Sequence, residues 1–391
     1  MVGISRLYCG RIEQSESLRY GRKDRPWKDI PDVPRPIVVW NMTRQCNLAC
    51  SHCYAACERS DTGDELSTSE AKLMIDDLSA FGVPYILFSG GEPLIRNDLA
   101  QLISYAAEKN VRSGLSTNGT IITDEKAKEL KDAGLSYAGI SIDGGEVNHD
   151  RMRNTKGSFL QSLIGLKNSM NSGLRCGIRF TVTRENIADV PEIFTIARMY
   201  GIDRICFYHL VYSGRGKQIR DMDLSLSEKR ILVDAIIDAT AKEHADGNLI
   251  EVLTVDNHCD GIFLYKRMRR EKSPHAAAVL NLLQKQGATG TGIGIGCIGW
   301  DGTVYPDQFW RSRPLGTIRE RTFSDIWSSS STELLRLLRE KHAHVTGRCA
   351  SCRYLDICGG NFRARAEAVH DDMWAPDPAC YLTDEEIQIR P

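Results

Sequence analysis

Cysteine is the residue type whose number and spacing in this sequence most directly indicate chemistry. The chain of 391 residues contains thirteen cysteines, and seven of them fall into two groups. A disulfide scaffold is usually short, secreted and even in its cysteine count, which argues against that class here. In a reducing compartment, grouped cysteines more often ligate metals or iron–sulfur clusters. Of the six scattered cysteines, Cys176 and Cys206 lie in or beside apolar runs and are expected to be buried structural thiols.

The first group consists of Cys46, Cys50 and Cys53, in a C-x3-C-x2-C arrangement directly after an apolar run. Three thiolates on one short loop can ligate three irons of a cubane [4Fe–4S] cluster and leave the fourth iron open. Cys57 follows closely, so a four-cysteine zinc or cluster site is the alternative. Zinc ribbons usually pair two C-x2-C units at longer separation, and we therefore expect Cys57 not to be a ligand.

The second group lies near the C-terminus and consists of Cys349, Cys352, Cys358 and Cys380. Four thiolates complete the ligand shell of a second [4Fe–4S] cluster. A structural four-cysteine zinc site is the alternative that this spacing leaves open.

The elements that must position these cysteines follow a regular alternation. Short apolar runs, typical of buried strands, are separated by amphipathic segments that begin after residues such as Ser67 and Thr123. This repetition predicts parallel strands joined by helices, an α/β fold. Six strands are fewer than the eight of a closed barrel, so we expect an open, partial barrel with functional loops at the strands' carboxyl ends. The six runs are Ile37–Trp40, Tyr85–Phe88, Val111–Leu115, Tyr137–Ile142, Gly177–Val182 and Arg204–Tyr208.

Composition excludes several classes of protein. Hydrophobic residues make up 42% of the chain and charged residues 26%, as in an ordinary globular protein. Fifty Lys and Arg against fifty-one Asp and Glu leave a net charge of −1, so we expect no nucleic-acid partner. No apolar run approaches the roughly 18–20 residues of a membrane span. The first ten residues lack a hydrophobic signal segment, and we expect a cytoplasmic protein.

The segment CNLACSHCY, followed by SGGEP at residues 89–93, resembles the radical S-adenosylmethionine (SAM) superfamily. The resemblance implies a partial (β/α)6 TIM barrel in which Cys46, Cys50 and Cys53 hold a [4Fe–4S] cluster. The open iron of that cluster chelates SAM, and one electron cleaves SAM to methionine and a 5′-deoxyadenosyl radical. The resemblance further implies cofactor contacts at the strand ends, from Gly90, Gly91, Glu92, Pro93, Thr117, Asn118, Ser141, Asp143 and Arg179.

The phrase CASCRYLDICGGN resembles the small C-terminal extension called a SPASM or Twitch domain. This resemblance implies that Cys349, Cys352, Cys358 and Cys380 hold an auxiliary [4Fe–4S] cluster. Full SPASM domains carry a second auxiliary cluster with a cysteine after G-x-V-Y-P, where this chain has Asp307. Cys297 lies upstream without evident partners, so we expect one auxiliary cluster.

The phrases ISRLYCG, SLRYGR and YPDQFW are similar to those of radical SAM enzymes of tetrapyrrole biosynthesis. The similarity implies a siroheme-derived substrate that loses two acetate side chains, or alternatively its propionates. Guanidinium groups suit the carboxylates of such a substrate, and aromatic rings suit its macrocycle. The expected substrate residues are Arg19, Arg22, Tyr208, Arg215 and Trp310, with His209 as a catalytic residue that could ligate the substrate iron or donate a proton.

These observations predict an organisation and a set of partners. We expect an N-terminal substrate-contacting segment over 1–35, a radical SAM core over 36–223, a helical linker over 224–290 and an auxiliary cluster domain over 291–391. The partners implied are the tetrapyrrole and an electron donor such as a ferredoxin or flavodoxin. A peptide-modifying enzyme of the same superfamily and a non-enzymatic iron–sulfur electron carrier are the competing interpretations.

Overall fold

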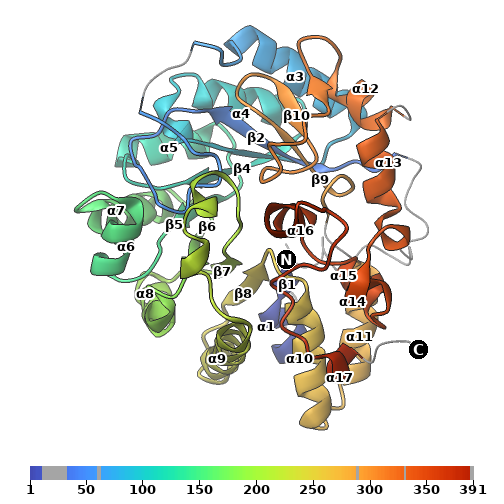
Figure 1. The fold of residues 1–391 in the computed structure, drawn as a ribbon. Helices are drawn as coiled ribbons and strands as arrows, with labels where there is room; N and C mark the ends of the chain where they lie inside the picture. Colours follow the sequence, from blue (N-terminus) through green and yellow to red (C-terminus); the bar gives the residue numbers. More distant parts are fainter. Residues whose placement is uncertain (11–32, 60–62, 288–289, 330–331, 388–391) are drawn as a thin grey trace.

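The core of the protein is a curved parallel sheet surrounded by helices (Figure 1). The computed structural model describes residues 1–10, 33–59, 63–287, 290–329 and 332–387. Seven neighbouring strands of the sheet are parallel: β2 (Ile37–Thr43), β3 (Tyr85–Gly90), β4 (Arg112–Thr117), β5 (Ala138–Ser141), β6 (Cys176–Val182), β7 (Arg204–His209) and β8 (Glu251–Val255).

Short strands extend this sheet at both edges. At one edge, β1 (Val2–Gly3) pairs antiparallel with β8. At the other, β9 (Ile295–Ile298) runs parallel to β2, and β10 (Thr303–Tyr305) and β11 (Gly316–Thr317) follow in antiparallel order. Covering the edges in this way leaves fewer unpaired backbone groups on the outermost long strands.

Amphipathic helices cover the outer face of the sheet. The crossovers between β2 and β8 include α3 (Thr68–Phe81), α4 (Leu99–Glu108), α5 (Asp124–Asp132), α6 (Glu146–Arg153), α7 (Ser158–Asn171), α8 (Val190–Tyr200) and α9 (Leu226–Ala245). Both α3 and α9 begin with a capping box, in which Ser67 bonds Glu70 and Ser225 bonds Glu228. Each box satisfies backbone N–H groups that a helix start otherwise leaves without partners. Their inward residues form one continuous core with the strands.

The partial-barrel prediction is confirmed, and all six predicted strands are present as β2–β7. A seventh parallel strand, β8, lies in the segment that the sequence predicted to be a helical linker. It has only five residues and lies between the long helix α9 and the helices α10 (Cys259–Arg270) and α11 (Ala276–Gln286). The polar, helical pattern of the surrounding sequence is why this short strand was not predicted.

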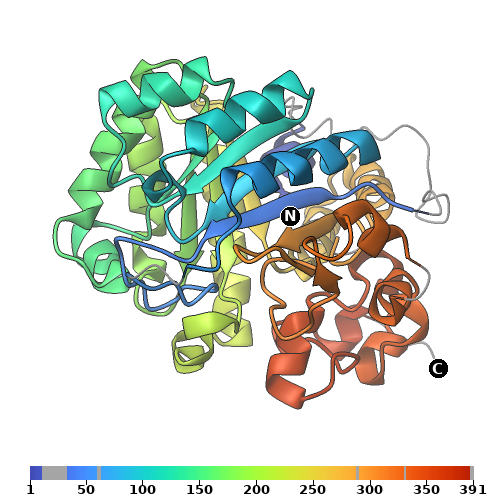
Figure 2. The same cartoon turned by 90° about the horizontal axis from the view of Figure 1, so that it is seen from above.

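The C-terminal part is mostly helical and packs beside the barrel near β2 and β9 (Figure 2). Strands β9 and β10 form an antiparallel hairpin. The helices that follow are α12 (Phe323–Ser328), α13 (Glu333–Arg339), α14 (Gly347–Ala350), α15 (Leu355–Cys358), α16 (Arg363–His370) and α17 (Asp384–Ile387), while α1 (Ile4–Cys9) packs on α9 and β8. Within the described residues, no helix combines the length and apolarity that crossing a membrane requires.

A fully buried ion pair joins the C-terminal helices to the barrel. Arg365 donates to Asp377 at 3.0 Å and also to the backbone carbonyl of Asp256, at the carboxyl end of β8. Asp377 in turn accepts backbone N–H groups from Phe362 and Ala379. The two charges therefore depend on each other, because neither has access to water.

We expect Asp377→Asn to destabilise the protein by about 3–5 kcal/mol, because it leaves the Arg365 guanidinium buried without a counter-charge. Urea unfolding followed by circular dichroism measures the effect. The matched control is Glu340→Gln, which removes an exposed carboxylate paired with Arg336 and should change stability little. Equal destabilisation by both variants would contradict the assignment.

Candidate active site and auxiliary cluster site

An open cavity lies at the carboxyl ends of the parallel strands. The cavity contains the three cysteines of the first group and many of the side chains predicted to contact a cofactor or substrate. Those in its wall are Cys46, Cys50, Cys53, Gly90, Gly91, Thr117, Asn118, Ser141, Arg179, Tyr208 and His209. Residues distant in sequence thus meet at one end of the barrel, as the parallel topology requires.

The loop that carries the first cysteines is fixed by backbone hydrogen bonds. Cys46 N donates to the carbonyl of Glu58 at 2.8 Å, which closes the loop. Arg215, after β7, donates its Nε to Cys50 O and its Nη1 to Cys57 O at 2.7 and 2.8 Å. The Arg215 guanidinium therefore clamps the loop, whereas the sequence analysis expected it to contact substrate.

A buried charge network lies against the middle cysteine. Arg153, on α6, donates to the sulfur of Cys50 at 3.4 Å and forms an ion pair with Asp143. His52 lies 3.4 Å from the same carboxylate, and burial lowers the pKa of His52 to about 4. Asp143 does not line the cavity itself, and its expected contact with the cofactor stays a prediction. Arg153 escaped the sequence analysis because no motif marks it.

The three thiols line one cavity, and thiolates are the usual ligands of iron–sulfur clusters. Burial raises the pKa of Cys46 to about 12 and also raises that of Cys50, so a bound cation would favour the thiolate form of both. A hydrogen bond between the Cys53 and Cys57 thiols lowers the pKa of Cys53 and raises that of Cys57. Cys57 also lines the cavity. That it is not a cluster ligand stays a prediction.

The glycines of the SGGEP segment are required by close packing. A Cβ atom on Gly91 would lie 1.8 Å from the carbonyl oxygen of Gln45, and one on Gly90 would lie 2.5 Å from that of Thr43. Gly91 N also donates to Thr43 O, and Glu92 N donates to Gln45 O. The end of β3 therefore fits directly against the cysteine loop, and the same two glycines line the cavity.

Glu92 connects two neighbouring strand ends. Its carboxylate accepts hydrogen bonds from Thr117 Oγ1 at 2.7 Å, Asn118 N at 2.8 Å and Leu94 N at 3.2 Å. Burial raises the pKa of Glu92 to about 7, against the lowering effect of these hydrogen bonds. Glu92 and its neighbour Pro93 lie behind the cavity wall, so they shape the cofactor site rather than line it.

Arg179 and Tyr208 form the wall on the side of β6 and β7. The Arg179 guanidinium lies 4.7 Å from the ring centroid of Tyr208. Among the described residues it has no carboxylate partner, so it can receive an anionic group of a ligand.

Of the other predicted substrate residues, those that the structure describes do not line this cavity. Trp310 donates its Nε1 to Glu367, and its ring is buried in a separate apolar cluster. Arg19 and Arg22 lie outside the described residues.

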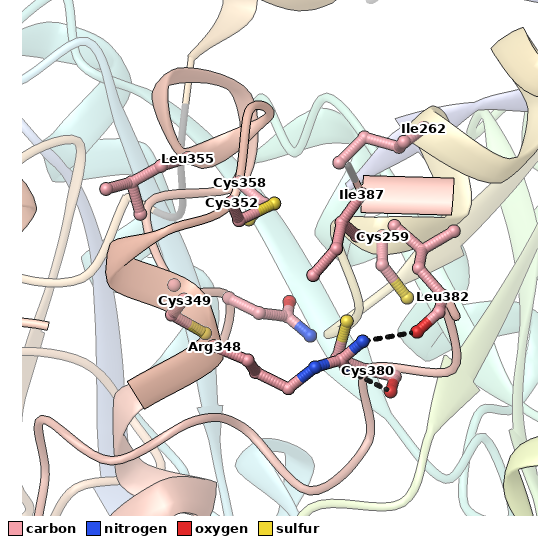
Figure 3. A pocket seen from close by; sticks show the side chains of 12 residues that line it. Cys259, Ile262, Arg348, Cys349, Cys352, Leu355, Cys358, Cys380, Leu382 and Ile387 are labelled. Atoms are coloured by element: carbon pink, nitrogen blue, oxygen red, sulfur yellow. Dashed lines mark hydrogen bonds between the residues drawn. The ribbon is translucent and has the colours of Figure 1, made fainter. Parts of the chain in front are cut away.

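The second cysteine group surrounds another cavity, of about 390 Å³ (Figure 3). The four predicted thiols line it, and a fifth, Cys259 at the start of α10, lies beside them. Arg348 fixes the loop of the last cysteine by donating to Cys380 O and Leu382 O. Cys259 escaped the sequence analysis because it lies far from the group along the chain.

Asp307 and Cys297 both have hydrogen-bond partners within the protein. Asp307 is buried and accepts from Thr291 Oγ1 at 2.6 Å and from Phe309 N at 2.8 Å. Cys297 is fully buried, and its sulfur contacts Asn41 Nδ2 and the carbonyl of Ile298. The expectation of a single auxiliary cluster stays a prediction.

Comparison with known families matches both parts of the chain. Residues 40–197 match the model of the radical SAM superfamily, and residues 295–353 match that of an iron–sulfur cluster-binding domain of the SPASM type. The chain is 51% identical to Fe-coproporphyrin III synthase of Methanosarcina barkeri over 99% of each protein. The chain belongs to the radical SAM superfamily. It is therefore a radical SAM enzyme, with SAM and a [4Fe–4S] cluster in the barrel and an auxiliary iron–sulfur domain.

A second relative supports this membership, and a solved structure shares the fold. Pre-heme d1 synthase of Dinoroseobacter shibae is 37% identical, over 90% of this chain and 88% of that protein. The structure of anSMEcpe with bound AdoMet superposes with a TM-score of 0.68 at 18% identity, covering 88% of this chain and 94% of the other. The second match shows that the fold is shared.

We propose that Cys46, Cys50 and Cys53 ligate the SAM-binding cluster, and that each is essential. Replacing any of them by alanine should reduce 5′-deoxyadenosine formation to background, because the loop then offers too few thiolates. Cys57→Ala is the matched control and should keep SAM cleavage. Chromatography of anaerobic reactions with dithionite measures the product. Normal cleavage by Cys46→Ala would show that the ligand set is wrong.

The auxiliary ligands can be tested by iron content. Two [4Fe–4S] clusters correspond to about eight irons per chain, and the variant with Cys349 and Cys352 replaced by alanine should retain about half. SAM cleavage should survive, since the barrel cysteines are untouched. Cys9→Ala, at the end of α1, is the control that should keep full iron content. Zinc in the anaerobically purified wild type would contradict the auxiliary cluster.

Proposed function

We propose that this enzyme removes the two acetate side chains of 12,18-didecarboxysiroheme and thereby forms Fe-coproporphyrin III. The observation that carries this proposal is the 51% identity to Fe-coproporphyrin III synthase over 99% of both chains. The alignment spans the barrel, both groups of cysteines and the C-terminal domain. The pre-heme d1 synthase relative is less similar, at 37% identity.

Different residues around the barrel cavity are assigned to SAM and to the substrate. When bound, the reduced cluster and SAM supply a 5′-deoxyadenosyl radical. We assign SAM to the wall formed by the glycines of SGGEP, Thr117, Asn118 and Ser141, next to the cysteine loop. Arg179 offers a half-buried guanidinium to a carboxylate within the same cavity.

The substrate then occupies the side of the cavity nearer the end of β7. Tyr208, His209 and Phe309 line this side, and aromatic rings suit a flat macrocycle. Phe309 is held edge-on against Tyr54 and Phe362, so it packs between the two parts of the protein. These rings also limit access of water to a radical intermediate.

The product follows from the chemistry of a reduced pyrrole ring. Abstraction of hydrogen from the saturated carbon beside the acetate-bearing carbon allows the bond to the acetate group to break. A ring double bond forms, the methyl group stays, and the departing fragment takes up one electron and one proton to leave as acetate. Each loss extends conjugation of the macrocycle, which favours this direction.

The electrons must come from outside the chain. We infer a low-potential donor such as a ferredoxin or flavodoxin, and a cytoplasmic site of action where such donors and SAM are present. The overall charge of −1 offers no general attraction for nucleic acid, which supports a small-molecule substrate and a protein donor as the partners.

Anaerobic incubation of the holoenzyme with 12,18-didecarboxysiroheme, SAM and dithionite tests this function. Mass spectrometry and co-elution with authentic material should identify Fe-coproporphyrin III, with 5′-deoxyadenosine formed alongside. Cys46→Ala is the control and should give neither product. A macrocycle that keeps both acetates but has altered propionates would instead support the chemistry of a pre-heme d1 synthase.

A further inference from the structure

His209 belongs to a chain of buried hydrogen bonds that begins in the barrel cavity. It is the last residue of β7, only 4% exposed, and its side chain lines the cavity. Its Nε2 lies 2.9 Å from Oδ2 of Asp260, a fully buried residue in the first turn of α10. The other carboxylate oxygen, Oδ1, accepts the hydroxyl of Tyr381 at 2.7 Å.

These hydrogen bonds determine which nitrogen of the His209 imidazole carries the proton. The Asp260 carboxylate accepts from Tyr381 on one oxygen, and its place in the first turn of a helix favours the ionised form. An ionised carboxylate only accepts hydrogen bonds, so Nε2 of His209 must be the donor. In a neutral imidazole, Nδ1 then has a free lone pair.

Nδ1 of His209 is available to a ligand. It receives no hydrogen bond from the residues that the structure describes, and it is not among the fully inaccessible polar atoms that lack a partner. Because His209 also lines the cavity, Nδ1 is the atom through which it can bind a ligand there. His52 also lines the cavity, but its ring lies against Asp143 and Arg153 beneath the cysteine loop.

A neutral histidine that donates its second N–H to a carboxylate has the arrangement typical of a metal ligand. The substrate of the proposed function carries an iron ion at the centre of its macrocycle. We propose, on the basis of that function, that His209 is an axial ligand of the substrate iron through Nδ1. Asp260 and Tyr381 are positioning residues that fix its tautomer and ring orientation.

The connection extends to the auxiliary site. Tyr381 directly follows Cys380, and Asp260 directly follows Cys259, so both positioning residues belong to the segments that line the auxiliary cavity. The hydrogen bonds that position His209 therefore come from segments that also carry cysteines of the auxiliary cavity. Axial ligation places the macrocycle at the end of β7.

Spectroscopic titration of the reconstituted holoenzyme tests the proposal, with iron didecarboxysiroheme and the same macrocycle without iron as probes. In the wild type, the iron probe should show the absorption and electron paramagnetic resonance signature of imidazole ligation. His209→Ala should lose this signature and bind the iron probe at least 10-fold more weakly, while its affinity for the iron-free probe stays unchanged. Asp260→Asn should weaken iron-probe binding by about 10- to 100-fold.

Rescue and control variants separate ligation from folding defects. Added imidazole should restore the signature in His209→Gly, and Tyr381→Phe should show a smaller loss than Asp260→Asn. His244→Ala, on α9 and bonded to Ile250 O, is the matched control that should behave as wild type.

Two outcomes would overturn the proposal in distinguishable ways. A wild-type spectrum and affinity in His209→Ala would exclude axial ligation by this residue, even if turnover falls, and would assign it to proton transfer. Failure of the wild type to bind either macrocycle would instead remove the proposed function, and this inference with it.

Discussion

The five residues that follow β8 hold the two cysteine sites in one structure. The carbonyl of Asp256 accepts Arg365, Asn257 donates to the carbonyl of Ala379, and the N–H of His258 bonds Asn361. Asp260 completes the set through Tyr381. Because this segment leaves the carboxyl end of a barrel strand, its bonds to the C-terminal helices fix the auxiliary cysteines relative to the cavity. The buried pair of Arg365 and Asp377 depends on the same contact.

Much of the fold could be predicted because its signals are local. Strands such as Ile37–Thr43 are buried on both faces of the barrel wall and so form continuous apolar runs. Helix starts such as Ser67 carry their own capping residues. The short strand β8 lacked such a signal, since its five residues take their conformation from pairing with β7 and β1. Cysteine spacing likewise marked both sites, because each group lies close together in sequence.

The contacts within the site were less predictable, because they join residues far apart in the chain. Arg153 reaches Cys50 across 103 positions, and Arg215 reaches the same loop across more than 150. The motif that contains Glu92 suggested a cofactor contact. In the structure its carboxylate accepts hydrogen bonds from Thr117 and Asn118 and so joins two strand ends. Sequence patterns identify which segments meet at the barrel mouth, whereas the partner of each charged group depends on tertiary packing.

Charges buried near the cavity are largely paired within the protein, and this has a functional consequence. Arg153 pairs with Asp143, and Glu92 accepts three hydrogen bonds, so neither needs to reorganise when a ligand enters. Two groups in the cavity wall lack such partners among the described residues. Arg179 has no carboxylate partner, and Nδ1 of His209 accepts no hydrogen bond. Free binding capacity is therefore concentrated at the ends of β6 and β7. An anionic ligand can therefore bind at these strand ends without displacing an ion pair within the protein.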